Sequence, residues 1–574
     1  MLNFFSSQLP PAVKRVLVVV FLLALRLSAA AQAPAWQSAQ AVATATAAAA
    51  SNYSAVRATA VDAAGNIFLA GNFSNTVVLG GTVLTSLGSY DVFVAKFNPA
   101  NNQFVWAQRA GGTGYDYVSA LVMSGTSMYI AGYFDSPTVN FGPTTLTNVG
   151  TNVSTDVFVA KLTDTGSTGS FAWAQRAGGT SYDFANALAL SGTSVYVAGH
   201  FISSTSDFGL TTLTNAGYAN VFVAKLTDAG STGSFTWAQR AGGTGADYAS
   251  ALAVSSTGLY LAGNFDSPTA NFGTAILTNV AASTGNNDVF VAKLVDAGST
   301  SSFVWAQRAG GIGNDRARAL AVSGAGVYVA GDFDGPTAGF GPTNLTNGGT
   351  SNIFVAKLSD VGSTSSFMWA QRAGGIYTDY ATALVVSGIS LYVAGSFSSP
   401  TANFGPTTLA PAGGFDLFVA KLTDTGTMGS FAWAQQAGGT GSDIANSLIV
   451  SGTSIHVAGI STSPTANFGP FIVSSPSNIL GFLASLTDPT LTATTAALPR
   501  EPASLFPNPA RRTATLRLPA GTAPAPLTLT DALGRAVRRY PAPAGSEAAL
   551  DLAGLPAGLY LLRGAGPAQR LAVE

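Results

Sequence analysis

The seven tryptophans of this 574-residue chain recur at nearly constant intervals, and this period constrains the fold more than any other feature. They stand 70, 67, 64, 68, 64 and 64 residues apart, and each except the first opens the sequence Trp-Ala-Gln-Arg-Ala-Gly-Gly or its variant with Gln for Arg. They are Trp36, Trp106, Trp173, Trp237, Trp305, Trp369 and Trp433. Repeats of this length are single supersecondary units that become stable by packing on their neighbours. Most of the chain is therefore predicted to be one repeat array.

Each repeat contains four apolar blocks bounded by Gly, Ser, Thr or Asp, a pattern typical of β-strands. In the unit that begins at Asn186 the blocks cover residues 186–191, 195–201, 221–226 and 235–240. Side chains alternate along a strand, and the third block is apolar on both faces, as in a sheet covered on both sides. The alanine-rich first block suits a crowded inner position, so we expect the tryptophan strand to lie outermost.

The number of strands predicts how the array ends. The second and third strands each occur seven times, whereas the strand of Trp36 precedes every other strand. The last repeat, residues 443–486, has no tryptophan strand after it. We expect the Trp36 strand to complete that repeat, because this removes the open sheet edges. The predicted fold is all-β, a seven-bladed β-propeller of four-stranded blades over residues 34–488 with the N-terminal strand closing the last blade.

Several recurring motifs resemble a known bacterial repeat. Ala-Gly-Gly-Thr-Gly-Tyr-Asp-Tyr at 110–117, Ser-Met-Tyr-Ile-Ala-Gly at 127–132, and Asp-Val-Phe-Val-Ala-Lys at 91–96 and 156–161 are similar to the SBBP-type bacterial β-propeller repeat. The resemblance implies a propeller fold and an exported setting, and it implies no common enzymatic activity. The first unit departs from the pattern, since Ser54 stands where the other units have Asp.

The N-terminus lies outside the array and has the order of a secretory signal peptide. Lys14 and Arg15 precede an apolar run at 16–25, and small residues follow at 28–33. We predict a signal peptide over residues 1–31, because the apolar run is shorter than the roughly 20 residues that span a bilayer. No other stretch is a candidate membrane span.

The C-terminus carries a second resemblance. A Thr/Ala/Pro-rich stretch at 489–502 is typical of a linker, and short alternating blocks predict a small β-sandwich over residues 503–574. Leu-Phe-Pro-Asn-Pro at 505–509, Asp-Ala-Leu-Gly-Arg at 531–535 and Leu-Pro-Ala-Gly-Leu-Tyr-Leu-Leu at 555–562 resemble the type A C-terminal sorting domain of the type IX secretion system. The resemblance implies the secretion machinery as a partner and delivery to the outer-membrane cell surface or the medium.

Composition limits the possible chemistry. The chain has no cysteine, which excludes disulfides, thiolate metal sites and cysteine nucleophiles. Charged residues make up only 9% of the chain, and Lys and Arg are not clustered, so we expect no nucleic-acid partner. Residues 34–499 carry 14 Lys and Arg against 22 Asp, and residues 500–574 carry 9 Arg against 5 acids, which indicates two differently built domains.

No catalytic constellation is evident, and we predict that the protein is not an enzyme. Only Glu501, Glu547 and Glu574 are glutamates, so a carboxylate pair that cleaves glycosidic bonds would have to be aspartates of the array. Six aspartates recur at one loop position per repeat, where an Asp side chain can cap backbone amides. They are Asp116, Asp183, Asp247, Asp315, Asp379 and Asp443. Five arginines stand seven residues before one of them, which suggests ion pairs across the loop; they are Arg109, Arg176, Arg240, Arg308 and Arg372.

No cofactor is predicted. Asp332-Phe-Asp-Gly335 resembles half of a calcium loop, but the other repeats have only one of its acids, so calcium binding stays an open alternative. His456 takes the position of a Tyr or Phe in the second strand, and we interpret it as a core substitution.

The position after Val-Ala-Gly at the end of the second strand varies from repeat to repeat, and repeat proteins tend to place variation on the binding face. Plain drift of a loop position is the alternative. The candidate ligand-binding residues are Asn72, Tyr133, His200, Asn264, Asp332 and Ser396.

The sequence thus predicts an exported, non-enzymatic binding or adhesion protein whose ligand is an extracellular glycan or protein. Two alternatives remain open. One is an Asp-based extracellular hydrolase or lyase acting on polysaccharide, and the other is a structural component of a surface layer.

Overall fold

The computed structural model describes residues 34–42, 44–45, 53–150, 154–280, 285–474, 479–491, 504–506, 508–517, 526–531, 535–543, 547–564 and 566–574. The predicted signal peptide and residues 492–502 of the predicted linker lie outside the described residues. The chain divides into two compact units, Met1–Ala493 and Thr494–Glu574.

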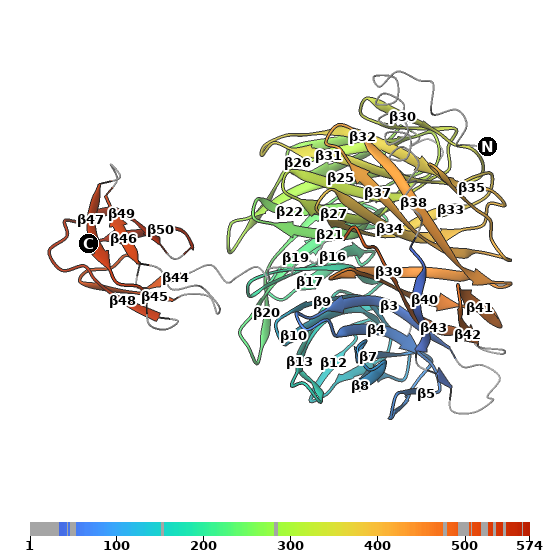
Figure 1. Ribbon diagram of the computed structural model, residues 1–574, viewed down its shortest axis with the longest axis horizontal. Helices are drawn as coiled ribbons and strands as arrows, with labels where there is room; N and C mark the ends of the chain where they lie inside the picture. Colours follow the sequence, from blue (N-terminus) through green and yellow to red (C-terminus); the bar gives the residue numbers. More distant parts are fainter. Residues whose placement is uncertain are drawn as a thin grey trace, which may run out of the picture. The chain divides into compact units, whose positions relative to one another are not determined.

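The first unit repeats one motif, a sheet of four antiparallel strands that follow one another in sequence (Figure 1). In the third copy of this motif the order is β15 (Asp183–Ser191), β16 (Ser194–Phe201), β19 (Asn220–Asp228) and β20 (Gly233–Ala241). These strands contain the four predicted blocks and extend them by one to three residues at their ends. The expectation of an all-β chain with repeated sheets is confirmed.

Five further copies have the same strand order. They are β3 (Ser54–Val61), β4 (Ile67–Phe73), β7 (Asp91–Asn98), β8 (Gln103–Gly112); β9 (Asp116–Ser124), β10 (Ser127–Phe134), β13 (Asp156–Asp164), β14 (Gly169–Ala177); β21 (Asp247–Ser255), β22 (Gly258–Phe265), β25 (Asp288–Asp296), β26 (Ser301–Gly311); β27 (Asp315–Ser323), β28 (Gly326–Phe333), β31 (Asn352–Asp360), β32 (Ser365–Ala373); and β33 (Asp379–Ser387), β34 (Ser390–Phe397), β37 (Asp416–Asp424), β38 (Gly429–Gly439).

The last copy takes its fourth strand from the N-terminal end. Its own strands are β39 (Asp443–Ser451), β40 (Ser454–Ser461) and β43 (Leu480–Thr487), and β1 (Trp36–Val42) pairs antiparallel with β43. The sheet order is therefore β1-β43-β40-β39.

Within this last sheet, Trp36 does not stand where the other tryptophans stand. The repeat tryptophan lies opposite the lysine of the third strand, as Trp173 lies opposite Lys161. In the last sheet Ser38 takes that position opposite Ser485, and Trp36 lies two residues earlier. The equivalence of Trp36 with the other tryptophans, expected from the period, is therefore wrong by two residues.

Trp36 instead takes the position of a phenylalanine such as Phe171. The ring of Phe171 packs edge-on against Phe141 of an outer hairpin with 5.5 Å between centroids, and Trp36 packs in the same way against Phe468 at 5.2 Å. Five of the other tryptophans, from Trp106 to Trp369, donate their indole N–H to an aspartate of the next copy. The first copy has Pro99 at the register position of that aspartate. An indole in the usual place would lack its acceptor there.

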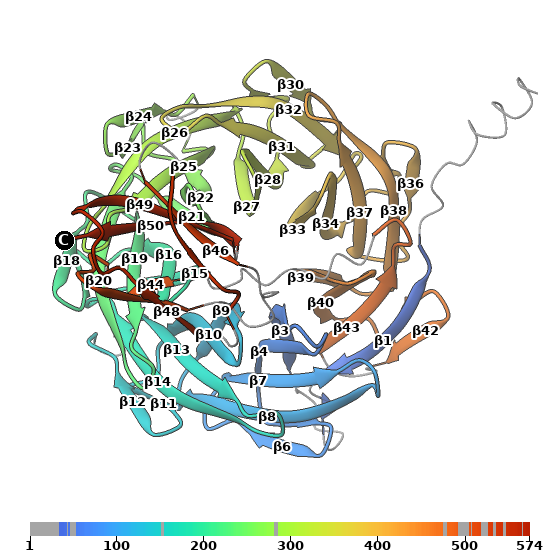
Figure 2. The same ribbon diagram turned by 60° about the vertical axis from the view of Figure 1, so that its left-hand side comes forward.

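The first strands of neighbouring copies contact one another in the succession β3, β9, β15, β21, β27, β33 and β39, and β39 also contacts β3. Figure 2 shows these strands at the centre and the tryptophan strands on the outside. The apolar clusters lie between adjacent sheets, as the two-sided third strand predicts. One cluster joins the first and last copies, with Val56 and Phe93 packed beside Ala458 and Leu483.

The segments between the second and third strands, for which the sequence predicts no strand, form outer β-hairpins. Alternating residues around a turn glycine with positive φ, such as Gly142 (φ 56°), let these Thr-rich segments pair. The hairpins are β5 (Thr76–Leu79) and β6 (Thr82–Thr85), β11 (Thr138–Phe141) and β12 (Thr144–Thr147), β17 (Thr205–Phe208) and β18 (Thr211–Thr214), β23 (Thr269–Phe272) and β24 (Ala275–Thr278), β29 (Thr337–Phe340) and β30 (Thr343–Thr346), β35 (Ala402–Phe404) and β36 (Thr407–Leu409), and β41 (Thr465–Phe468) and β42 (Phe471–Ser474), with β2 (Thr44–Ala45) paired to β5.

The C-terminal unit is a small β region of two sheets. One has the order β44 (Ser504–Phe506), β45 (Thr513–Arg517), β48 (Glu547–Asp551), and the other β47 (Ala536–Tyr540), β46 (Leu527–Thr530), β49 (Gly558–Gly564), β50 (Gly566–Val573). Both sheets contribute to one apolar core, in which Leu516 and Leu550 of the first pack with Leu529, Leu562 and Leu571 of the second. The alternating blocks at 513–518, 527–530, 548–552 and 559–563 predict β45, β46, β48 and β49, and the other three strands are not predicted.

Candidate ligand-binding pocket

The repeated loop aspartates are buried anchors of the backbone. Asp116 accepts hydrogen bonds through Oδ2 from the backbone N–H of Gly112 at 2.6 Å and from Ser136 Oγ at 2.9 Å. The other five accept the same N–H from the glycine four residues earlier. All six are fully buried, so the predicted capping role is confirmed. Burial raises the pKa to about 7 in Asp116, about 6 in Asp183 and about 8 in Asp315.

The repeated arginines do not pair with these aspartates. Arg109 forms its ion pair with Asp91 at the start of the third strand, with 2.5 Å between Nη1 and Oδ2. The predicted pair across the loop is wrong because Arg109 lies on β8, next to β7, whereas Asp116 begins the next sheet. Equivalent contacts join Arg176 to Asp156, Arg308 to Asp288, Arg240 to Asn220 and Arg372 to Asn352.

A second aspartate, in the turn between third and fourth strands, links each sheet to the preceding one. Asp228 accepts Lys161 Nζ at 2.6 Å, Trp173 Nε1 at 2.9 Å and Tyr129 Oη at 2.7 Å. Although burial raises the pKa of Asp228, Lys161 and the other donors hold it below its usual value. The corresponding carboxylates are Asp164, Asp296, Asp360, Asp424 and Asp488.

The interface between the last and first copies, here named the seam, lacks this network. Ser485 replaces the lysine, Ser38 the tryptophan, His456 the tyrosine and Pro99 the aspartate. Ser38 Oγ and Ser485 Oγ lie 2.7 Å apart and hydrogen-bond to each other. Burial lowers the pKa of His456 to about 4, which fits its predicted core position.

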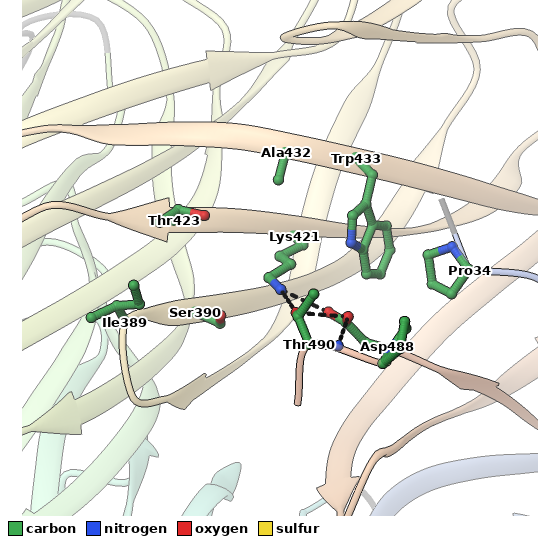
Figure 3. Close-up of a pocket in the computed structure, with 10 residues that line it drawn as sticks. Pro34, Ile389, Ser390, Lys421, Thr423, Ala432, Trp433, Asp488 and Thr490 are labelled. Carbon is green, nitrogen blue, oxygen red and sulfur yellow. Dashed lines mark hydrogen bonds and ion pairs between the residues drawn. The ribbon is translucent and has the colours of Figure 1, made fainter. Parts of the chain in front are cut away.

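One pocket, of about 590 Å³, lies over Trp433 beside the Lys421–Asp488 ion pair and Pro34 (Figure 3). In other copies the hairpin between the third and fourth strands of the next copy covers the tryptophan. Gly233 of one such hairpin lies so close to Trp173 that a Cβ added to it would stand 2.7 Å from the indole ring. The third and fourth strands of the last sheet come from opposite ends of the unit, so no such hairpin joins them over Trp433. This pocket is therefore a consequence of the strand exchange.

A second pocket, here named the inner pocket, is built by β-bulges of the first strands. Each first strand has one residue that is skipped in its register with the second strand, and a bulge re-aims such a side chain. These residues are Arg57, Ser119, Asn186, Ser250, Arg318, Thr382 and Asn446. The inner pocket has a volume of about 340 Å³ and is lined by Arg57, Ser119, Asn186 and Asn446 together with Tyr117, Val118 and Tyr133.

Hydrogen bonds between neighbouring copies fix this wall. Asn186 Nδ2 donates to the carbonyl oxygen of Ala249 at 2.7 Å, and Asn446 Nδ2 donates to that of Val56 at 2.8 Å. Neither amide oxygen accepts a hydrogen bond among the described residues, and both side chains line the pocket, so the amides can serve as acceptors there. Arg57 lies outside the β3–β4 register, and its Nη2 donates to Tyr53 Oη at 2.8 Å.

Aromatic rings from four consecutive copies form a continuous set beside the inner pocket, here named the aromatic arc. Tyr117 stacks on Tyr133 with 5.2 Å between centroids, and Tyr133 meets Phe184 edge-on at 4.7 Å. The arc comprises Tyr53, Tyr90, Tyr115, Tyr117, Tyr133, Tyr182, Phe184, His200 and Tyr248. Burial raises the pKa of Tyr117 and Tyr133 and lowers that of His200 to about 3, so these rings are uncharged at neutral pH.

The structure places the six predicted ligand-binding residues in two settings. Tyr133 and His200 belong to the aromatic arc, where Phe184 lies between them. The other four are buried and do not belong to the lining of the inner pocket: Asn72 donates to Asp116 O, Asn264 to Asn287 Oδ1 and Ser396 to Asp443 O, and Asp332 is paired with two arginines. The ligand-binding role stays a prediction for all six.

The carboxylates of the half calcium loop are engaged by other groups. Asp332 binds Arg316 at 3.2 Å and Arg318 at 2.5 Å, and Asp334 Oδ1 accepts the backbone N–H of Asn314. Nowhere in the described ranges do three or more His, Asp or Glu side chains gather as a metal site.

The bulge residues of the inner pocket were missed by the sequence reasoning. Each stands three residues after the loop aspartate or its counterpart Ser54, and the position varies among Arg, Asn, Ser and Thr. The same criterion that selected the end of the second strand, variation within a constant repeat, would have found it.

Comparison with known proteins identifies the C-terminal unit. Residues 504–570 match the family model described as secretion system C-terminal sorting domain, which confirms the resemblance of the three C-terminal motifs. No curated protein matches the chain. The protein is therefore exported through type IX secretion to the cell surface or medium, and its C-terminal unit interacts with the secretion machinery. Among the described residues no helix is long and apolar enough to cross a membrane.

Proposed function

We propose that the first unit is a seven-bladed β-propeller of the SBBP type, closed by β1. Three observations support closure: β1 pairs with β43, β3 contacts β39, and one apolar cluster joins the first and last copies. Closure protects the edge of β43, which would otherwise expose unpaired backbone groups.

We further propose that this exported propeller is a non-enzymatic binding domain for an extracellular glycan. The aromatic arc beside the inner pocket carries the proposal. Ligand sites combine aromatic surfaces with a few fixed polar groups, and the inner pocket offers Tyr117 and Tyr133 with Ser119 and Asn186. The C–H-rich face of a sugar ring packs on the negative face of an aromatic ring, while its hydroxyls need such polar partners.

The aspartate-based hydrolase or lyase receives less support. It would require two convergent, non-repeated aspartates in a cleft, because one carboxyl must donate a proton and the other must stabilise or attack. The lining of the inner pocket includes no carboxylate. The aspartates whose pKa is raised, such as Asp116 and Asp315, are repeated and fully buried.

Screening of the purified protein on a glycan array tests the binding proposal. The matched variants are Tyr117→Ala, within the aromatic arc, and Tyr377→Ala, which removes an exposed tyrosine outside it. Loss of one stacking ring should weaken glycan binding about three- to tenfold in Tyr117→Ala and leave Tyr377→Ala unchanged. Release of reducing ends from the same glycans, without stable binding, would favour the hydrolase instead.

A further inference from the structure

Arg57 is a cation that has no counter-ion among the residues that the structure describes. It is half-buried in the wall of the inner pocket, and its one hydrogen bond runs from Nη2 to Tyr53 Oη at 2.8 Å. In the part of the chain that the structure describes, Arg57 forms no ion pair, and the pocket lining contains no carboxylate.

Arg318 provides a direct comparison within the same molecule. It occupies the same bulge position in the fifth copy, where Asp332 lies 2.5 Å from its Nε and Tyr380 lies under its guanidinium at 5.2 Å. Arg316 binds the second oxygen of that carboxylate. The fold can therefore supply a carboxylate to an arginine at this position, and it does not do so at Arg57.

The surroundings of Arg57 leave its charge uncompensated. Tyr117 and Tyr133 lie beside it in the pocket, and burial raises the pKa of both, so the phenols stay neutral. Asn186 and Asn446 are neutral amides, and each donates one N–H to a backbone carbonyl of the neighbouring copy. A half-buried guanidinium keeps several N–H donors in a planar fork that matches a carboxylate, and such charge-assisted bonds are about twice as strong as neutral ones.

We propose that the inner pocket binds the carboxylate of an acidic sugar, with the guanidinium of Arg57 on the carboxylate and the sugar ring against Tyr117 and Tyr133. This proposal rests on the proposed glycan-binding function and names its substrate class, uronic-acid polysaccharides. The bridging amides Asn186 and Asn446 accept hydrogen bonds from the sugar hydroxyls.

Two features favour an acidic sugar over an acidic peptide. The volume of about 340 Å³ stands at the lower end of the range of roughly 300–1,000 Å³ for ligand sites and suits one or two sugar residues. The stacked pair of Tyr117 and Tyr133 offers a ring face, which a saccharide uses and the flexible stem of a Glu or Asp side chain does not.

The test compares polygalacturonate with its fully methyl-esterified form, in which each carboxylate has lost its charge and carries one methyl group. Isothermal titration of the full exported chain measures both, at 50 mM and 500 mM NaCl. The variants are Arg57→Gln, the conservative Arg57→Lys, and Arg318→Gln as the matched control, each checked by its melting temperature.

The wild type is expected to bind the acid at least about tenfold more tightly than the ester, and high salt should reduce this preference. Arg57→Gln should bind both polymers equally, Arg57→Lys should keep part of the preference because it retains the charge but not the fork, and Arg318→Gln should behave as wild type.

Equal affinity of the wild type for acid and ester would overturn the inference and leave the glycan-binding proposal standing, provided that Tyr117→Ala weakens both. Loss of preference in Arg318→Gln but not in Arg57→Gln would also overturn it. Binding of polyglutamate with the same dependence on Arg57 would replace the sugar by an acidic peptide. If no glycan binds at all, both proposals fail.

Discussion

The links between neighbouring sheets give the sharpest stability prediction, and Asp360→Ala is the perturbation that tests them. Asp360 Oδ2 accepts Lys293 Nζ at 2.7 Å and Tyr260 Oη at 2.6 Å, and Oδ1 accepts Trp305 Nε1 at 3.1 Å. Removal of the carboxylate leaves three donors from the preceding sheet without their shared acceptor. One of them is a buried cation.

The expected loss follows from burial. The side chains of Lys293 and Asp360 are only 3% and 4% exposed. Breaking a buried ion pair by removing one partner costs about 3–5 kcal/mol, because the remaining charge is desolvated and unpaired. Although burial raises the pKa of Asp360, Lys293 and the other donors hold it below its usual value, so the carboxyl group of Asp360 is ionised at neutral pH. We therefore expect Asp360→Ala to lower the free energy of unfolding by about 3–5 kcal/mol.

Urea denaturation followed by tryptophan fluorescence measures this loss. All seven tryptophans lie between positions 36 and 433, so the signal reports the first unit alone. The control is Ser485→Ala, which removes the neutral hydrogen bond at the corresponding position of the seam and should cost about 0.5–1.5 kcal/mol. The double variant Lys293→Met/Asp360→Leu replaces both charges by apolar groups and should recover at least about 2 kcal/mol relative to Asp360→Ala.

Two results would refute this reasoning. One is a loss below about 1 kcal/mol in Asp360→Ala, which would make the pair no more important than a surface pair. The other is a double variant that loses as much as Asp360→Ala or more, since removal of the Lys293 charge would then recover nothing and the unpaired cation could not be the source of the loss.

Three further predictions concern the whole chain. Deletion of β1 removes the buried Trp36 and Val42 and exposes the edge of β43, so the melting temperature of the first unit should fall by at least about 10 °C, and unchanged melting would contradict closure. The melting temperature should be highest near pH 4. Asp116, Asp183, Asp315 and Asp416 have a raised pKa, so they contribute stability that is full below pH 3.8 and is lost as the pH rises through about 6 to 8. Groups whose pKa is lowered, such as Asp360, contribute stability above pH 3.8 that is lost below it. A maximum above pH 8 in a fluorescence melting series would contradict these shifts. Removal of residues 503–574 should leave a folded first unit in the periplasm, detectable by cell fractionation, and normal delivery of the truncated chain to the surface would contradict the sorting role of the matched domain.

The repeated strands could be predicted because their pattern is local: apolar blocks and turn residues recur at a fixed distance, so each copy supports the others. The outer hairpins are not predicted, because Thr, Asn and Gly are frequent in loops as well as in short hairpins. Only the alternation of Val139 and Phe141 with polar residues indicates a strand there.

The position of Trp36 shows where a period misleads. Ala39-Gln40 matches the Ala-Gln pair that follows every other repeat tryptophan, and this match places Ser38, not Trp36, in the tryptophan position. An alignment on tryptophan alone places Trp36 in the wrong position, because the position beside Phe468 is filled by a tryptophan in this sheet and by a phenylalanine such as Phe171 in another.

The candidate site was only half predictable. Variation at the end of the second strand identified Tyr133 and His200, which lie in the aromatic arc. The bulge that re-aims Arg57 and Asn186 has no strong sequence signal, because one extra residue in an alanine-rich strand leaves its composition unchanged. Pairing of Arg109 with Asp91 was missed for a related reason, since the contact follows from strand register and not from distance along the chain.

The inner pocket and the seam share residues, and this couples binding to the integrity of the ring. Asn446 of the last copy donates to Val56 O of the first, and Ser447 bonds Thr59 next to it, so the wall beside Arg57 exists only when the seam is formed. The seam has a hydrogen-bonded serine pair where the other interfaces have a buried Lys–Asp ion pair. A ligand held between Arg57 and Asn446 therefore stabilises the interface that has the fewest charged links. At a concentration of 100 times its dissociation constant, the ligand should add about 2.7 kcal/mol to the free energy of unfolding. The gain should be larger in the Ser485→Ala variant than in the Arg57→Gln variant. Melting experiments with polygalacturonate measure both gains. An equal shift in the Arg57→Gln variant would place the ligand elsewhere.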